Sequence, residues 1–276
     1  AGDAGGALGA ALLVWHKELD KPRTISKIDS MKGAFLGPEY NQEEIENSLL
    51  KCGAKFEVLD DDSIIKTTAK ALVEGKAIGW FQGRMEFGPR ALGARSIIAD
   101  PRSEKMQKTL NLKVKYRESF RPFAPSVLRE DLNEWFDFDY DSPYMLLVCD
   151  VKKNIRYELN ETEKKLFGID KLNIKRSKIP AVTHVDYSAR IQTVHKETNP
   201  KYHSLISRFK EITGCPLLVN TSFNVRGEPI VCTPTDAFKC FMGTQLDALV
   251  VGNYFLIKED QKIELIESYK EKYALD

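Results

Sequence analysis

Short apolar runs alternate with amphipathic segments along most of this chain of 276 residues. Apolar side chains recur at helical spacing in Ile64–Lys76, and a continuous apolar run, Ala77–Phe81, follows directly. Runs of this length between turn signals are typical of buried strands, and strand–helix alternation places such strands in one covered sheet. The sequence therefore predicts an α/β (or α+β) fold with a mostly covered sheet.

The same patterns predict the remaining elements. Thr233 is expected to cap a helix that has Pro234 at its first position and Asp236 three residues after the cap. Residues 21–40 are predicted to be a connector, and the Lys-rich residues 152–178 a surface excursion. Further strands are expected at Ser96–Ala99, Phe123–Leu128, Tyr144–Val151, Arg190–Val194, Pro216–Val219 and Leu249–Ile257, and further helices at Glu43–Leu50, Glu104–Leu112, Glu130–Phe136, Tyr202–Thr213 and Thr233–Gln245.

Composition excludes several classes of protein. The 41 Lys and Arg residues balance 40 Asp and Glu residues, which excludes a disordered polyelectrolyte and a protein that binds polyanions over its whole surface. No apolar run reaches the roughly 18–20 residues that cross a bilayer. The five cysteines are widely spaced and include no C-x-x-C pair. This disfavours a disulfide scaffold and a thiolate zinc site, and favours the reducing cytoplasm.

One stretch of the chain is strongly basic. Residues 84–129 carry eleven Lys or Arg residues and four acidic ones. Within it, the Gly-rich residues 83–96 follow a predicted strand and include Arg84, Arg90 and Arg95. Glycine lets the backbone approach a ligand, and arginine donates two parallel hydrogen bonds to phosphate or carboxylate. The segment predicts a site for a small anion, with a structural loop carrying surface arginines as the alternative.

Two further segments carry candidate binding residues. In residues 114–125, Lys115, Arg117 and Arg121 are interleaved with aromatic residues, a pattern that also suits single-stranded nucleic acid. Two prolines make this segment rigid, which favours a small-anion pocket, although a structural role stays open. In residues 217–229, an apolar strand ends in short polar residues. Ligands of open α/β sheets gather at such strand ends, but the same residues also build turns.

The histidines show no metal-binding pattern. None of the four lies at H-x-x-x-H or H-E-x-x-H spacing, so the chain lacks a self-sufficient metal site of that kind. His184 precedes Arg190 near a predicted strand, where a lone histidine is more often structural than catalytic. No G-x-S-x-G nucleophile motif is present either.

Four segments together resemble the O-carbamoyltransferase family, which includes nodulation proteins and enzymes that carbamoylate antibiotics: GWFQGRMEFGPRALGARSIIADPR (79–102), VKYRESFRPFAPSVL (114–128), THVDYSARIQTV (183–194) and LLVNTSFNVRGEPIVCTP (217–234). The resemblance implies an N-terminal part with an actin/sugar-kinase fold, which uses iron to transfer a carbamoyl group to a substrate hydroxyl. It also implies a C-terminal part with a YrdC-like fold, a twisted mixed sheet flanked by helices, which makes carbamoyl adenylate from carbamoyl phosphate and ATP. We expect residues 1–32 to be a remnant of the first part with a linker, and residues 33–276 to be the second part.

The resemblance also implies roles for individual residues. Lys115, Arg121 and Arg190 are expected to be catalytic. Asp3 stands at the family's metal-ligand position, but the histidine pair that completes the iron site lies upstream in the family. Tyr187 stands where the family often has glycine, which would narrow the mouth of the pocket. Carbamoyl phosphate and the ATP phosphates are expected to contact Arg90, Arg95, Lys115, Arg121, Arg190, Asn220 and Ser222, with Arg84, Arg117, His184, Asn224 and Arg226 as neighbours.

The resemblance also bears on the metal ion and the acceptor, whereas the oligomeric state and the alternative functions stay open. Mg²⁺ is expected to accompany ATP, and the final acceptor is an unidentified hydroxyl compound. A homodimer is one open arrangement. An RNA- or nucleotide-binding YrdC-like module without carbamoyl chemistry is the alternative function, and RNA affinity would then fall steeply with salt. A docking or regulatory domain with an inactive pocket is a third reading, which the set of Arg and Lys residues disfavours.

Overall fold

The computed structural model describes residues 5–24, 29–172, 174–262 and 265. In this part of the chain, eight strands form one sheet in the order β1-β10-β9-β2-β3-β8-β4-β7. The pairs β2–β9 and β4–β7 are parallel, and the pairs β1–β10, β10–β9, β2–β3, β3–β8 and β8–β4 are antiparallel. The strands are β1 (Glu57–Val58), β2 (Ile78–Phe81), β3 (Arg95–Ala99), β4 (Ala124–Leu128), β7 (Gln192–Val194), β8 (Leu217–Ser222), β9 (Ala248–Val251) and β10 (Tyr254–Ile257).

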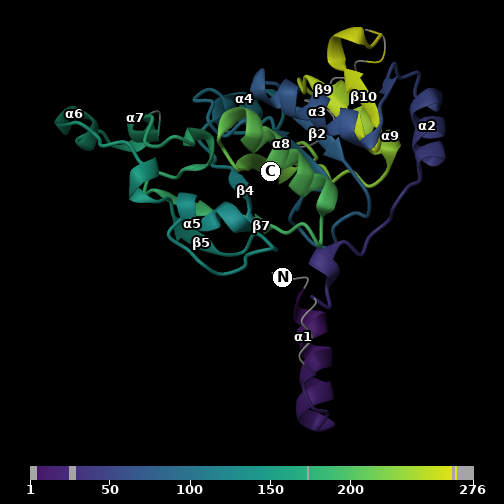
Figure 1. Cartoon of the computed structure of the whole chain (residues 1–276), viewed down its shortest axis with the longest axis horizontal. Coiled ribbons are helices and arrows are strands. Elements are labelled where there is room, and N and C mark those ends of the chain that lie inside the picture. The colour runs from purple at the N-terminus through teal and green to yellow at the C-terminus, as the bar shows by residue number, and fades with distance from the viewer. Residues whose placement is uncertain (1–4, 25–28, 173, 263–264, 266–276) are drawn as a thin grey trace.

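Helices cover the sheet (Figure 1). Helix α8 packs against α3 and reaches β4 and β8, whereas α9 packs against β2, β9 and α2. Strands β2, β3, β4 and β9 are buried along their whole lengths, as expected for strands covered on both faces. The predicted mixed sheet flanked by helices is therefore confirmed. The helices are α2 (Gln42–Lys51), α3 (Asp61–Val73), α4 (Met106–Lys113), α8 (Pro200–Thr213) and α9 (Pro234–Gly243).

Local sequence signals fix the ends of the main helices. Thr233 and Asp236 form the expected capping box at the start of α9, which satisfies two backbone N–H groups that the first turn leaves free. Helix α8 ends at Gly214, whose φ of 73° is the left-handed conformation that favours glycine. These two helix boundaries agree with the sequence prediction.

Four predicted elements are wrong in their extent. Leu249–Ile257 is not one strand but the hairpin of β9 and β10, because Gly252 turns the chain with a φ of 57°. Arg190–Val194 divides between β6 (Ser188–Arg190) and β7, and Tyr144–Val151 contributes only β5 (Val148–Asp150), which pairs with β6. Glu130–Phe136 contains only a short 3₁₀ helix and α5 (Leu132–Trp135).

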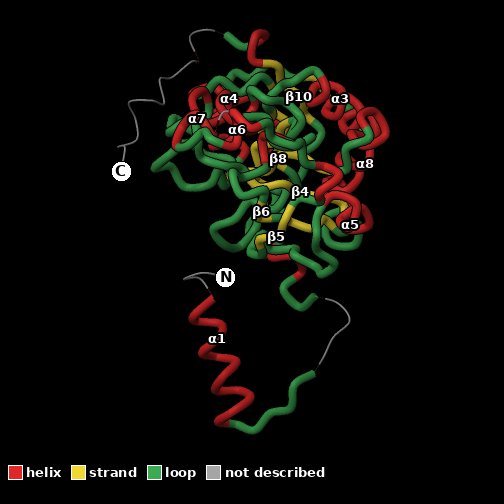
Figure 2. The backbone as a smooth tube through the Cα atoms, turned by 90° about the vertical axis from the view of Figure 1, so that its left-hand side faces the viewer, coloured by secondary structure: helices red, strands yellow, loops and turns green. Residues whose placement is uncertain are grey.

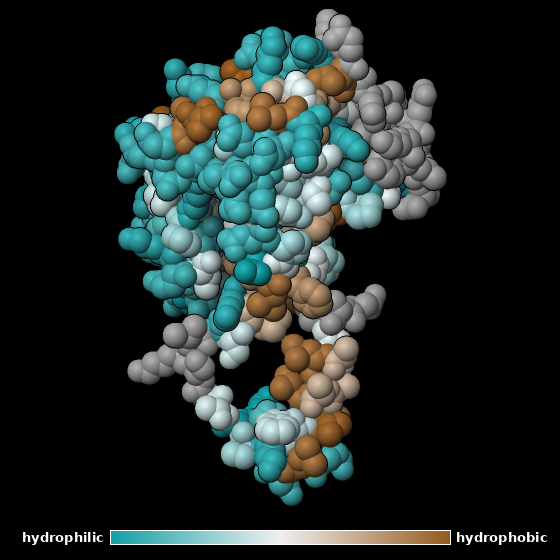
Figure 3. Space-filling model, turned by 90° about the vertical axis from the view of Figure 1, so that its right-hand side faces the viewer, coloured by the Kyte–Doolittle hydropathy of each residue, from teal (hydrophilic) through white to brown (hydrophobic). Residues whose placement is uncertain are grey.

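Two segments extend from the main body. The surface excursion predicted at residues 152–178 carries the short helices α6 (Glu161–Lys164) and α7 (Gly168–Leu172), which project from the sheet in Figure 1. Helix α1 (Gly5–Leu13) has no buried residue and stands apart from the body in Figures 1 and 2. Its exposed apolar side chains are visible in Figure 3. Among the described helices, none combines the length and the apolarity that crossing a membrane requires.

Candidate functional site

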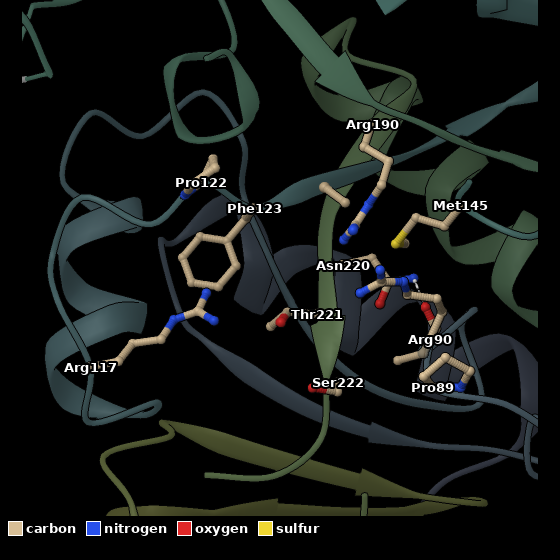
Figure 4. Close-up of a pocket in the computed structure, with 12 residues that line it drawn as sticks. Pro89, Arg90, Arg117, Pro122, Phe123, Met145, Arg190, Asn220, Thr221 and Ser222 are labelled. Carbon is tan, nitrogen blue, oxygen red and sulfur yellow. Dashed lines mark hydrogen bonds between the residues drawn. The ribbon is translucent and has the colours of Figure 1, made fainter. Parts of the chain in front are cut away.

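A cavity of about 140 Å³ lies at the end of β8. Asn220, Thr221 and Ser222 form its floor, Arg117 lies on one side, and Arg90 and Arg190 lie on the other side (Figure 4). These three arginines come from three separate segments, and no Asp or Glu is among the lining residues. Such a cavity is suited to a small anion. The full lining is Pro89, Arg90, Ala91, Arg117, Pro122, Phe123, Ala124, Met145, Arg190, Asn220, Thr221 and Ser222.

The turn that follows Arg90 is stabilised by the buried carboxylate of Glu86. Glu86 is 5% exposed, and its side chain accepts hydrogen bonds from the backbone N–H groups of Leu92 (2.6 Å), Ala94 (2.7 Å) and Arg95 (3.2 Å). Burial raises the pKa of Glu86. The turn therefore depends on one side chain to satisfy three of its donors.

The carbonyl groups of the same turn are satisfied from three neighbouring elements. The side-chain amide of Asn220 donates to Ala91 O (3.1 Å), that of Gln192 donates to Leu92 O (2.8 Å), and the indole of Trp80 donates to Gly93 O (3.0 Å). Gly93 has a φ of 101°, and a Cβ atom there would lie 2.3 Å from the ring of Tyr202. Only glycine fits this position, and the backbone around Arg90 is fixed by buried hydrogen bonds.

Arg95 is turned away from the cavity. Its guanidinium group is fully buried and donates to the carbonyl groups of Gln82, Gly83, Ala94 and Pro38. It also lies 3.5 Å from the centre of the Phe81 ring, and burial lowers its pKa to about 10. The structure therefore gives Arg95 backbone partners and does not place it among the lining residues.

Arg117 reaches the cavity from the opposite side. Its Nε donates to Asn111 Oδ1 (2.6 Å), and its guanidinium group lies 5.0 Å from the centre of the Phe123 ring. Burial and the nearby Arg121 lower the pKa of Arg117 to about 10. Arg121 itself is exposed, pairs with Glu118 at 2.9 Å and does not line the cavity.

Lys115 supports the floor from beneath. It is 4% exposed, and its ammonium group donates to the backbone and side-chain oxygens of Ser222 and Asn224. Burial and the nearby Arg117 lower the pKa of Lys115 to about 7. Lys115 is not itself a lining residue, so its charge reaches the cavity through Ser222.

Two side chains of the cavity keep unused hydrogen-bonding atoms. Among the described residues, nothing accepts a hydrogen bond from the buried Nε of Arg190, and nothing donates one to the buried Oδ1 of Asn220. Burial and the nearby Arg90 lower the pKa of Arg190. Both atoms are buried beneath the cavity surface, where unpaired polar atoms are uncommon.

The remaining candidate residues lie elsewhere or serve as supports. Arg84 pairs with Glu39 at 3.2 Å, and His184, whose pKa is lowered by burial, lies near Arg190 without lining the cavity. Asn224 holds Lys115, and Arg226 lies 3.7 Å from Glu118. Asp3 lies outside the described residues.

Tyr187 does not narrow the cavity, because it is not among the lining residues. Its φ of 65° lies in the left-handed region, which explains why glycine would suit this position. The Tyr187 ring lies 4.9 Å from the guanidinium carbon of Arg156. Its place is therefore beside the surface excursion.

The sequence analysis missed several residues of the site. Phe123, Met145 and Thr221 line the cavity, and Glu86 and Gln192 hold its Arg90 side. A signal existed for Glu86, because it is the only acidic residue in the basic segment 83–96. In the described part of the chain, no three His, Cys, Asp or Glu side chains lie together as a metal site. The described residues therefore do not fit the family's iron.

A family model and several curated relatives match this chain. The family model described as carbamoyltransferase C-terminus matches residues 69–258. The uncharacterized protein sll1178 of Synechocystis sp. is 55% identical over all of this chain and 45% of its own length, and nodulation protein NolNO of Sinorhizobium fredii is 41% identical over 93% of this chain and 35% of its own. The 3'-hydroxymethylcephem-O-carbamoyltransferase of Streptomyces clavuligerus is 37% identical over 67% of this chain and 31% of its own length.

Among solved structures, full-length HypF in its phosphate- and nucleotide-bound form matches with a TM-score of 0.42 and 19% identity, over 71% of this chain and 22% of that chain. This likeness is too weak to carry an argument about function. The chain spans less than half the length of the curated relatives above. The family model covers more than half of the chain, which confirms the resemblance drawn from the four segments. The chain therefore belongs to the carbamoyltransferase family and corresponds to its C-terminal part.

Proposed function

We propose that this chain makes carbamoyl adenylate from carbamoyl phosphate and ATP, and so activates a carbamoyl group for transfer to a hydroxyl of a small molecule or sugar. The observation that carries the proposal is the convergence of Arg90, Arg117 and Arg190 on one small cavity without a lining carboxylate. Membership of the carbamoyltransferase family supports the carbamoyl group as the one transferred.

The cavity is large enough for carbamoyl phosphate but not for the whole of ATP. Pockets for drug-sized ligands measure roughly 300–1,000 Å³, whereas this cavity measures about 140 Å³. It suits an anion as small as carbamoyl phosphate. ATP would insert its phosphates toward Arg117 and leave its adenosine outside.

The proposed chemistry has two steps. Water first cleaves carbamoyl phosphate to carbamate and inorganic phosphate. A carbamate oxygen then forms a bond to the α-phosphorus of ATP, and the bond from that phosphorus to pyrophosphate breaks. Mg²⁺ would accompany ATP and offset part of the charge on its phosphates, as in other nucleotide-dependent reactions. The products are carbamoyl adenylate, pyrophosphate and phosphate.

In these steps the chain supplies charge and position. Arg90, Arg117 and Arg190 would offset the repulsion between two polyanions and stabilise the charge that develops on the leaving groups. Lys115 would orient Ser222 and add a positive charge behind the floor. Arg121 would act indirectly, because its charge lowers the pKa of Arg117.

The experiment is the exchange of labelled pyrophosphate into ATP. We expect exchange that depends on carbamoyl phosphate, and a loss of about 100-fold or more in Arg190→Ala and in Arg117→Ala. Arg208→Ala is the matched control, because Arg208 pairs with Glu211 on the surface of α8. A wild-type chain that neither catalyses exchange nor binds ATP would refute the proposal. An RNA affinity that falls steeply with salt would favour the alternative function.

We also propose that the activating domain comprises residues 33–276 and that residues 1–32 belong to a preceding part of the protein. Ala34 supports this boundary, because it forms a buried apolar cluster with Leu92, Ala124 and Met145, two of which line the cavity. Helix α1, by contrast, has no buried residue. The transfer step and its iron are assigned to no described residue.

A further inference from the structure

We propose that Tyr144 is a positioning residue for the cavity. Through its hydrogen bond to Asp29 it holds Met145 in the cavity wall beside Arg190, so that the segment before the sheet helps to set the affinity of the cavity for an anion. This inference goes beyond the proposed function, because it concerns how the cavity is held together and applies to any small anion that binds there.

Both ends of the turn that carries Met145 are anchored. At the first end, the Ser142 hydroxyl donates to Ile191 O (3.0 Å), and the N–H of Thr193 donates to Ser142 O (3.0 Å). At the other end, the N–H of Ile191 donates to Leu147 O (3.1 Å). In between, the N–H of Met145 lies 3.5 Å from Ser142 O, which is long for a hydrogen bond. The anchors therefore leave the middle of the turn to be held by other contacts.

Met145 has an unfavourable backbone conformation in this turn. Its φ of 54° lies in the left-handed region, which is costly for a residue with a Cβ atom. Strained residues persist only where their surroundings hold them, and they gather at functional sites. The side chain of Met145 is 3% exposed and lines the cavity. Contacts from outside the turn must therefore keep it in place.

Part of this support comes from the segment that precedes α2. Met145 shares a small buried apolar cluster with Ala34, separate from the main core, and Phe35 and Tyr144 pack against this cluster. The wall of the cavity is thus backed by residues that lie more than a hundred positions earlier in the chain.

One carboxylate joins that segment to the turn. Asp29 accepts hydrogen bonds from the backbone N–H groups of Met31 (2.9 Å) and Gly33 (2.8 Å), and it also accepts one from the hydroxyl of Tyr144. A hydrogen bond to a charged group is stronger than one between neutral groups. Removing the Tyr144 hydroxyl would therefore release the residue next to Met145.

The position of Met145 bears on the charges of the cavity. Met145 and Arg190 line the same cavity, and Figure 4 shows their side chains near each other and near Arg90. The attraction between a cation and an anion is stronger where water is excluded. An inward Met145 side chain keeps water away from this side of the cavity, so its displacement should weaken the binding of an anion.

The test measures the binding of inorganic phosphate by calorimetry. Tyr144→Phe removes only the hydroxyl, and we expect phosphate to bind about 5- to 10-fold more weakly. Met145→Ala removes the apolar side chain, and we expect a loss of about 10-fold or more. Tyr140→Phe is the matched control, because it removes a hydroxyl from an exposed ring that does not line the cavity. Its affinity should equal that of the wild type.

A double variant decides whether the hydroxyl acts through Met145. If it does, Tyr144→Phe combined with Met145→Ala should bind phosphate as weakly as Met145→Ala alone. Asp29→Asn reaches the same hydrogen bond from its other partner, so it should weaken binding in the wild type and add little to Tyr144→Phe. Tyr144→Phe keeps the ring and Asp29 is exposed, so both variants should fold and melt near the wild-type temperature.

The outcomes distinguish this inference from the proposed function. Wild-type affinity in Tyr144→Phe overturns the positioning role, and so does a double variant whose loss is the product of the two single losses. A wild-type chain that binds no phosphate overturns it too, even if carbamoyl phosphate-dependent exchange occurs. If the expected affinities are found in a chain without exchange, the proposed function fails and the role of Tyr144 stands.

Discussion

The two sides of the cavity are built in opposite ways. The Arg90 side is a buried turn whose backbone groups are bonded by Glu86, Gln192 and Trp80. On the facing side, the Arg117 guanidinium group is held by side chains, through a hydrogen bond to Asn111 Oδ1 and the ring of Phe123, and the backbone N–H of Arg117 makes one hydrogen bond, to Asn111 O (3.0 Å). The backbone after Arg90 cannot shift without losing several buried hydrogen bonds, although the Arg90 side chain itself is exposed. We infer that the first side keeps its backbone in place when a ligand binds, whereas the second can adjust through its side chains.

The largest expected effect comes from removing the carboxylate under the fixed side. Glu86→Ala leaves three buried N–H groups without an acceptor, so we expect the free energy of unfolding to fall by about 3–6 kcal/mol. Urea denaturation measures it. Glu118→Ala is the control, because Glu118 forms ion pairs that are exposed to solvent and screened by it. Equal effects of the two substitutions would show that the turn does not depend on Glu86.

The next test separates an arginine that supports the fold from one that faces the ligand. Arg95→Lys loses several hydrogen bonds to carbonyl groups, so we expect a fall of about 1–3 kcal/mol in stability with little change in affinity for carbamoyl phosphate. Arg190→Lys should do the reverse, with affinity about 10-fold weaker and stability nearly unchanged. Denaturation and calorimetry on both variants measure the two quantities. If Arg95→Lys weakens binding more than Arg190→Lys, our assignment of the two arginines is reversed.

A third prediction concerns the buried cation beneath the floor. The pKa of Lys115 is lowered from 10.5 to about 7, so between these values the unfolded chain binds more protons than the folded chain. Stability then rises with pH, by at most about 1.4 kcal/mol per pH unit. The advantage of the wild type over Lys115→Met should therefore grow between pH 7 and pH 9. The exposed Lys113→Met is the control, and a constant difference for Lys115→Met would contradict the shift.

The smallest effect on stability and affinity is expected at Tyr187, which lies on neither side of the cavity. Tyr187→Asn keeps a residue that tolerates positive φ but removes the ring beside Arg156. Two terms of about 0.5–1 kcal/mol oppose each other here, so stability should change by less than about 1 kcal/mol. Affinity for carbamoyl phosphate should not change, because Tyr187 does not line the cavity. Tighter binding by this variant would indicate that Tyr187 does narrow the entrance.

Much of the fold could be predicted because its signals are local. The capping box at Thr233 and the glycine at the end of α8 mark helix ends through backbone hydrogen bonds that a few neighbouring residues determine. The hairpin of β9 and β10 was missed although Gly252 and Asn253 form a turn signal, because the apolar residues on both sides read as one run.

The site was predicted less completely for a physical reason. Spacing along the chain identified Arg90, Arg190, Asn220 and Ser222, and the structure brings these residues together. Spacing could not show that Arg95 turns toward backbone carbonyl groups or that Arg121 turns toward Glu118. The direction of a long side chain depends on partners that are distant in sequence.

The position of β8 has a consequence for how substrates enter. Val219 and Asn220 of this strand pair with β3 along one edge and with β4 along the other, so this part of the sheet should open only when the whole domain unfolds. The strands therefore do not part to admit a molecule. Substrates must enter over the rim, where an exposed side chain such as that of Arg90 changes rotamer within picoseconds to nanoseconds.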